Sequence, residues 1–188
     1  HVGLRTRLAE TFSIPIANDD LLLATVGALI ERKGQAYAIK ALAHLPRGRL
    51  LLIGRGEDDA SLRALARDVG VADRVHFLGS LDPAMLPPIL SAADAMVLPS
   101  ASEGLANAWI EALACGTPLV ITDAGGAREV VTSPDAGVIV ARNCRAVREG
   151  IELVTARPRS PETVAATVDK FSWEANGRAL AAYYETLA

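Results

Sequence analysis

The stretch Pro99–Glu111, which reads PSASEGLANAWIE, decides the fold predicted for this chain. The short apolar run 94–99 precedes it and is typical of a buried strand. From 105 to 114 apolar residues recur at helical spacing, and Gly116 and Pro118 then end the helix. The stretch therefore predicts a strand, a turn of small residues and a helix whose N-terminus faces the carboxyl end of the strand.

Two carboxylates, Glu103 and Glu111, bracket the predicted start of that helix. The free N–H groups of a helix N-terminus hold anions, phosphate above all. At ~1.5 Å rise per residue, the carboxylates would lie roughly 12 Å apart along the axis. Carboxylates accept strong hydrogen bonds from hydroxyl groups, so this spacing suits a sugar nucleotide, with its phosphates in the middle. The plainer alternative makes Glu103 a first-turn acid and Glu111 part of a solvated face.

The composition favours one globular domain, which we place at residues 1–188. With 51% hydrophobic residues, a chain of 188 residues can bury one sizeable core but not two. A net charge of −3 without a basic stripe argues against nucleic acid as a partner. No apolar run reaches the length of a membrane span and no signal peptide is recognisable, so we expect a cytoplasmic protein. The two cysteines and three scattered histidines lack metal-ligand spacing, so we expect free thiols and no metal.

Apolar runs and helical patterns alternate along the rest of the chain. Further strands are predicted at 21–27, 49–54, 75–79, 119–122 and 137–140, and helices at 35–45, 58–69, 127–132 and 145–156. This alternation predicts an α/β fold, a Rossmann-like doubly wound parallel sheet of about six strands.

The remaining segments lie outside this alternation. Residues 1–18 look like a linker and lead-in helix, and Ser172 should cap a terminal helix that runs to Leu187. A helix should begin at Asp82-Pro83, but Pro87-Pro88 should break it and leave an irregular segment before Asp94.

Ligands of such sheets bind at the carboxyl ends of the strands. The loop after the first strand contains Gly27 and leads to Lys33, whose charge suits a diphosphate leaving group. After the second strand, Gly54 and Gly56 begin a dinucleotide-like pattern, but Asp59 stands at its third glycine position. This pattern is weak for an NAD site and instead suits a turn that a base or ribose approaches.

Taken in order, these motifs resemble the group 1 glycosyltransferases, a large retaining family of the GT-B fold. The resemblance covers nearly the whole chain and rests on Gly27…Lys33-Gly34, Gly54-Arg55-Gly56, Val75–Gly79, Ala93-Asp94, Pro99-Ser100, Glu103-Gly104, Glu111–Pro118 and Gly125-Gly126…Glu129-Val130. Its most specific part is the pair Glu103 and Glu111 within SEG…EALACGTP.

The resemblance implies that this chain is the C-terminal, donor-binding half of a hexosyltransferase that uses a UDP- or GDP-linked sugar and needs no cofactor. An acceptor domain would precede it, so the chain alone is expected to be inactive. The helix at 171–188 would pack on that domain, which would also carry any membrane contact. By similarity, Glu103 (donor sugar) and Lys33 (diphosphate) are the catalytic candidates. The implied donor-binding residues are Gly27, Lys33, Gly54, Gly56, Phe77, Leu78, Leu81, Glu103, Gly104, Leu105, Ala106 and Glu111.

The chain departs from the family in its first loop, where many members carry Arg directly after the glycine. Here that residue is Ala28, so either Arg32 replaces the missing phosphate cation or Lys33 acts alone. Two other functions stay open from the sequence. One is a nucleotide-sugar binding module without catalysis, and the other is a GT-B sugar-nucleotide epimerase.

Overall fold

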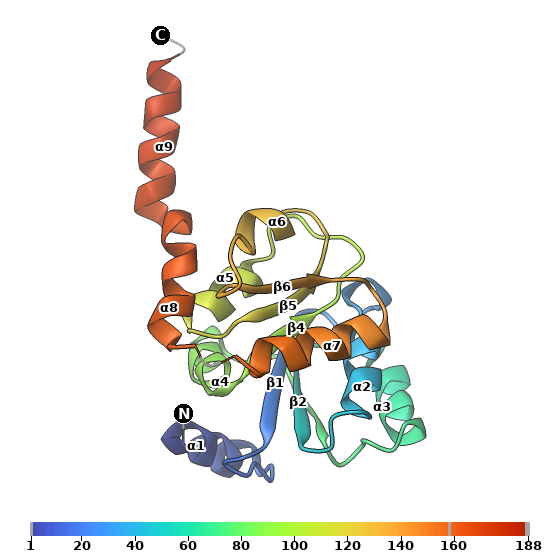
Figure 1. Cartoon of the computed structure of the whole chain (residues 1–188). Helices are drawn as coiled ribbons and strands as arrows, with labels where there is room; N and C mark the ends of the chain where they lie inside the picture. Colours follow the sequence, from blue (N-terminus) through green and yellow to red (C-terminus); the bar gives the residue numbers. More distant parts are fainter. Residues whose placement is uncertain (1, 158, 187–188) are drawn as a thin grey trace.

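The structure is a computed structural model that describes residues 2–157 and 159–186 (Figure 1). Its strands are β1 (Leu21–Val26), β2 (Gly48–Ile53), β3 (Val75–Gly79), β4 (Ala95–Leu98), β5 (Leu119–Thr122) and β6 (Gly137–Val140). They form one parallel sheet in the order β3-β2-β1-β4-β5-β6. This confirms the predicted α/β class, and the order is that of a Rossmann-like sheet.

Helices cover both faces of the sheet. They are α1 (Val2–Phe12), α2 (Gln35–Leu42), α3 (Asp59–Asp68), α4 (Leu86–Ala92), α5 (Asn107–Ala114), α6 (Ala127–Val130), α7 (Cys144–Thr155), α8 (Pro161–Ala165) and α9 (Trp173–Glu185), with the 3₁₀ turns η1 (Glu31–Lys33), η2 (Pro83–Met85) and η3 (Ala166–Phe171). Helices α2, α3 and α7 bury their apolar sides on one face, and α1, α4, α5 and α8 on the other.

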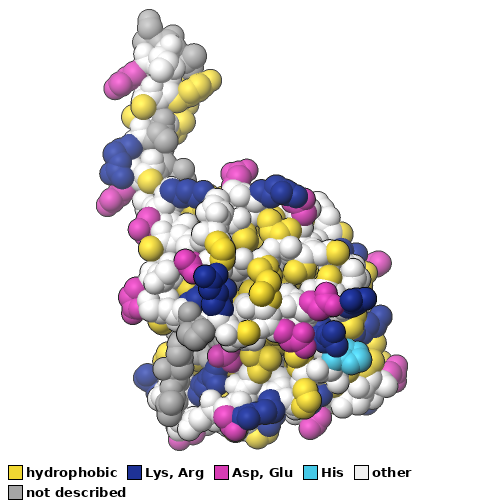
Figure 2. Space-filling model, in the orientation of Figure 1, with side chains coloured by type: hydrophobic (Ala, Val, Ile, Leu, Met, Phe, Trp, Pro, Cys, Tyr) yellow, Lys and Arg dark blue, Asp and Glu magenta, His cyan; other side chains and the backbone are white. Residues whose placement is uncertain are grey.

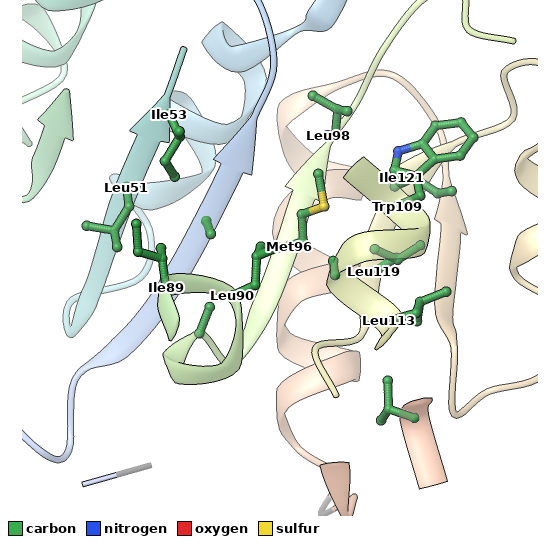
Figure 3. Packing of buried hydrophobic residues seen from close by; sticks show 14 of the residues in the cluster. Leu51, Ile53, Ile89, Leu90, Met96, Leu98, Trp109, Leu113, Leu119 and Ile121 are labelled. Atoms are coloured by element: carbon green, nitrogen blue, oxygen red, sulfur yellow. The ribbon is translucent and has the colours of Figure 1, made fainter. Parts of the chain in front are cut away.

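The core follows from the alternation of side chains along each strand. In β1, Leu22 belongs to the cluster with α4 and α5, whereas Leu23 belongs to the cluster with α2 and α7. Figure 3 shows that Met96 and Leu98 of β4 lie on the face of the sheet that α4 and α5 cover. Trp109 of α5 belongs to the same cluster. Strands buried on both faces need continuous apolar runs, and this explains why six short runs sufficed to predict the sheet.

One helix prediction was wrong. Pro87 and Pro88 do not break α4, because they occupy its first turn, where backbone N–H groups have no partner within the helix. The predicted start before them is real: the side chain of Asp82 accepts a hydrogen bond of 2.8 Å from the N–H of Ala84 and caps η2. Two further elements, α8 and η3, were not predicted; they follow Ser160, which is the N-cap of α8.

The first and last helices differ in how they contact the rest of the domain. Helix α1 packs on the body through Leu8, and the buried Arg5 forms an ion pair of 2.8 Å with Asp94, so the lead-in segment is part of the folded unit. Helix α9 instead projects away from the body and carries hydrophobic side chains on its surface (Figures 1 and 2). Ser172 caps it as predicted, whereas Leu187 lies outside the described residues. No helix in the described ranges has the length and apolarity of a membrane span.

Candidate functional site

The loops at the carboxyl ends of β1 and β4 meet, and they bring Lys33 and Glu103 into contact. Lys33 Nζ lies 2.6 Å from Glu103 Oε1, and the guanidinium of Arg32 lies 3.8 Å from the other carboxylate oxygen. The side chain of Glu103 is 7% exposed and that of Lys33 is 15% exposed. The two residues that the resemblance named as catalytic candidates therefore form one partly buried ion pair on the rim of the sheet.

The turn η1 holds Lys33 against the loop that carries Glu103. Gly34 follows the turn with φ of 75°, and a Cβ there would lie 2.2 Å from the carbonyl oxygen of Pro99, so only glycine fits. The N–H of Ala101 donates to the carbonyl of Arg32 at 2.7 Å, and the Arg32 guanidinium donates to the carbonyl of Ser102. Through these two hydrogen bonds, Arg32 joins the two loops beside Lys33.

The helix after β4 starts later than the sequence predicts. Helix α5 begins at Asn107, so Glu103 lies in the preceding loop and the rise along a helix does not set its distance from Glu111. Extended backbone at Ala106 delays the helix. In the part of the chain that the structure describes, the N–H groups of Gly104, Leu105 and Ala106 donate no hydrogen bond. The free donors predicted at a helix N-terminus are therefore present, but they belong to a loop.

Glu111 lies on α5 and is exposed to solvent, unlike Glu103. Its environment is open enough for a ligand hydroxyl to reach it. The two carboxylates thus differ in a way that the sequence did not indicate: one is held by cations, and the other is free to accept a new hydrogen bond.

Gly125 and Gly126 pack directly against the backbone of the loop that carries Glu103. A Cβ on Gly125 would lie 2.2 Å from the carbonyl oxygen of Glu103, and the N–H of Gly126 donates to the carbonyl of Gly104 at 2.9 Å. These two glycines therefore allow the loop after β5 to lie directly against the loop that carries Glu103.

The glycines of the β1 and β2 loops also face backbone. A Cβ on Gly54 would lie 2.0 Å from the carbonyl oxygen of Gly27, and one on Gly56 would lie 2.1 Å from that of Leu29. A Cβ on Gly27 would lie 3.7 Å from the nearest methylene of Lys33. These glycines let the β1 and β2 loops lie side by side, and Gly27 borders the side chain of Lys33.

The residues predicted to hold a base lie at the end of β3. A shallow cavity of ≈ 440 Å³ is lined there by Arg55, Gly56, Asp59, Arg63, Phe77, Leu78 and Gly79. The guanidinium of Arg63 lies 4.0 Å from the centroid of the Phe77 ring, so it covers one face of that ring. Leu78 and Leu81 are partly buried against the core.

A larger cavity of ≈ 630 Å³ lies at the opposite edge of the sheet, where β1, β4 and β5 begin. Its charged side chains include Arg5 and Arg47, which pair with Asp94 and Asp19. The larger cavity therefore does not lie at the loops that follow the carboxyl ends of the strands. We place the candidate site at those loops, because ligands of such sheets bind there and because they carry the pair of Lys33 and Glu103.

Two polar residues that the sequence analysis did not single out also shape the site. Gln35 is buried at the start of α2 and donates 2.8 Å to the carbonyl of Ala28, which is itself exposed. Arg142 follows β6 and donates to the carbonyls of Glu31 and Pro99. Arg142 could have been found, because it lies two residues after a predicted strand, at the rim. Gln35 offered no such signal.

Neither a metal site nor a reactive thiol stands out. In the described ranges, no group of three or more His, Cys, Asp or Glu side chains could hold a metal ion. Both cysteines are free, and burial raises the pKa of the Cys115 thiol. A partly buried thiol with a raised pKa is a poor nucleophile at neutral pH.

The sequence has recognisable relatives. The family profile described as "Glycosyl transferases group 1" matches residues 7–170. The lipopolysaccharide core biosynthesis glycosyltransferase LpsE of Rhizobium meliloti is 38% identical over 65% of this chain and 35% of its own length. A GDP-mannose-dependent monoacylated alpha-(1-6)-phosphatidylinositol monomannoside mannosyltransferase of Corynebacterium glutamicum is 35% identical over 72% of this chain and 36% of its own.

Solved structures give the same grouping. A sucrose-phosphate synthase from Thermosynechococcus elongatus superimposes with a TM-score of 0.83 and 30% identity, over 100% of this chain and 49% of that protein. Anabaena HepE in complex with UDP gives a TM-score of 0.77 and 26% identity, over 91% and 48%. The chain thus spans about a third to a half of the length of these relatives. From the match over residues 7–170, the chain belongs to the group 1 glycosyltransferases.

Proposed function

We propose that this chain is the donor-binding half of a glycosyltransferase that transfers a hexose from a nucleoside-diphosphate sugar to an acceptor, with retention of configuration. A preceding acceptor domain of the same polypeptide would complete the active site. The observation that carries the proposal is the meeting of Lys33 and Glu103, 70 residues apart in sequence, at the carboxyl edge of the sheet.

Each part of the donor then has a matching group. Lys33 and the free N–H groups of Gly104–Ala106 would bind the diphosphate, where preorganised donors stabilise the charge that develops on the leaving group. Glu103 would accept hydrogen bonds from the sugar hydroxyls, and the exposed Glu111 from the ribose. The cavity at Phe77–Gly79 would take the base.

Relatives whose descriptions name a uridine or a guanosine nucleotide support a UDP- or GDP-linked donor. HepE has been solved in complexes with UDP and with UDP-glucose, and the Corynebacterium relative is described as GDP-mannose-dependent. Because the chain contains one Lys at the site and no metal-ligand group among its described residues, the diphosphate would bind without a divalent ion.

Calorimetry of the 188-residue chain with UDP, GDP, ADP and their sugar conjugates tests the proposal. We expect one diphosphate to bind with equal affinity in EDTA and in magnesium, and transfer to be absent. Failure of all three nucleotides to bind would contradict the proposal. In a longer polypeptide that carries the acceptor domain, turnover of the sugar nucleotide without an acceptor would indicate an epimerase instead.

A further inference from the structure

Arg142 connects three loops at the carboxyl edge of the sheet. It follows β6, and its Nε–H donates to the carbonyl of Pro99 at 3.0 Å. A terminal nitrogen of the same guanidinium donates to the carbonyl of Glu31 at 2.7 Å. The guanidinium also lies 5.0 Å from the centroid of the Tyr37 ring on α2, within the range of a cation–π contact.

The two carbonyls that Arg142 holds flank the pair of Lys33 and Glu103. Glu31 is the first residue of η1, the turn that ends at Lys33. Pro99 begins the loop that leads to Glu103, and its carbonyl faces Gly34 directly after η1. A single side chain therefore fixes the backbone on both sides of the ion pair.

An arginine suits this task better than any other side chain. Its planar guanidinium can donate to two carbonyls in different directions while it stacks on an aromatic ring, whereas a lysine ammonium is a compact point charge. Pro99 is buried, and a buried carbonyl that loses its donor carries a desolvation cost. Without Arg142, a shift of η1 or of the Pro99 loop would relieve this free-energy cost by exposing the carbonyl to water. Either shift would move Lys33 relative to Glu103.

We propose that Arg142 is a positioning residue for the donor diphosphate: it holds η1 against the Pro99 loop so that Lys33 stands where the phosphates bind. Two of its five N–H donors are used by backbone carbonyls, and its role in this proposal is to hold the loops rather than to bind the ligand. This inference rests on the proposed function, since it takes the ligand that Lys33 binds to be the diphosphate of the donor.

A double-mutant cycle separates positioning from general stability. UDP and GDP binding is measured by calorimetry for the wild type, Arg142→Met, Lys33→Met and the combined variant, with Arg145→Met as the matched control. Arg145 lies on α7 close to Arg142, but its exposed side chain pairs with Glu149. We expect Arg142→Met to weaken the bound diphosphate about tenfold, the loss of one charge-assisted hydrogen bond, Arg142→Lys to recover only part of this, and Arg145→Met to bind as the wild type.

The combined variant decides whether Arg142 acts through Lys33. If it does, Arg142→Met adds no further loss once Lys33 is gone. Additive losses, or wild-type binding by Arg142→Met, would overturn the inference while leaving the proposed function intact. Should Arg142→Met not fold, Arg142→Gln, which keeps one amide donor, replaces it in the cycle.

A measurement without ligand tests the same positioning. Amide hydrogen exchange at Lys33, Gly34 and Ala101 reports the hydrogen bonds that close η1 and join it to the Pro99 loop. Exchange there should accelerate in Arg142→Met and not in Arg145→Met, with the amides of the sheet unchanged in both. Unaltered exchange at all three amides would overturn the inference even if no nucleotide bound to the wild type.

Discussion

Lys33 Nζ and Glu103 Oε1 lie 2.6 Å apart, and both side chains are largely withdrawn from solvent. Each charge of the free site is thus already compensated by the other. If the donor binds as proposed, its diphosphate would compete with Glu103 for the ammonium group of Lys33, and a sugar hydroxyl would meet a carboxylate that already accepts a hydrogen bond. The stability of the domain and the affinity for a donor would then be coupled through this one contact.

Loss of Lys33 should therefore destabilise the domain as well as weaken binding. Lys33→Met leaves the Glu103 carboxylate buried beside Arg32 alone, which we expect to cost about 3 kcal/mol. In a chain of this size this corresponds to roughly 6–12 °C in Tm, measured by circular dichroism. Lys33→Met combined with Glu103→Gln removes both charges and should regain most of the Tm. A double variant no more stable than Lys33→Met would contradict the pairing.

Glu103 and Glu111 should separate the sugar from the nucleotide. Glu103→Gln releases Lys33, so the bare diphosphate should bind as tightly as to the wild type or more tightly, whereas the sugar conjugate loses hydroxyl contacts. Glu111→Ala should weaken both ligands roughly tenfold through a lost ribose contact. Calorimetry with paired ligands measures this difference. Equal loss of the bare diphosphate in both variants would show that the roles of the two carboxylates are assigned wrongly.

A second cation at position 28 should strengthen diphosphate binding. Ala28 is exposed next to Gly27, and Gly27 borders the side chain of Lys33, so an arginine there has room to reach the same anion. Ala28→Arg should tighten the bound diphosphate by up to about tenfold. Ala28→Gln, of similar length but neutral, is the control for calorimetry. An equal gain from both variants would argue that charge is not the cause.

His76 should make the stability depend on pH below its usual pKa of 6.5. Burial, helped by the positive charge of Arg49, lowers the pKa of His76 from its usual 6.5, and Nε2 has no hydrogen-bond partner among the described residues. The unfolded chain therefore binds this proton more readily, so the contribution to stability is complete above pH 6.5 and falls as the pH drops below it. The Tm of the wild type should decrease over this interval.

Substitution isolates the contribution of His76. His76→Leu should flatten the dependence of Tm on pH in this interval, whereas substitution of the exposed His44 by Gln should leave the slope unchanged. A slope that persists in His76→Leu would mean that another group titrates there.

The exposed face of α9 should matter only in a longer polypeptide. Leu180, Tyr183 and Tyr184 are 54%, 59% and 62% exposed. Their joint replacement by Ser should change the stability of the 188-residue chain by less than about 1 kcal/mol, because surface substitutions cost little. In a polypeptide that carries the preceding acceptor domain, the same change should lower Tm clearly.

Leu153→Ser provides the control for this comparison. Leu153 is equally exposed but lies on α7, away from α9, so it should be neutral in both polypeptides. An unchanged Tm of the longer polypeptide after replacement of the α9 residues would contradict a docking role for this face.

The sheet and most of its helices could be predicted from the sequence, because local patterns of apolar residues specify them. Strands β4, β5 and β6 lie where their short apolar runs predict them, since strands buried on both faces need such runs. Local steric rules failed only where position within an element decided the outcome. Pro87 and Pro88 fit the first turn of α4, and extended backbone at Ala106 moved the start of α5 to Asn107.

How the loops of the site meet depends on the packing of the strands and could not be predicted from the sequence. The contact of Lys33 with Glu103 joins residues 70 positions apart, and the contact of Arg142 with Glu31 joins residues 111 apart. No periodicity encodes such pairs, because they depend on the strand order that brings β1, β4 and β6 to a common rim. The sequence determined which chemical groups lie at that rim, and the packing of the strands determined which of them touch.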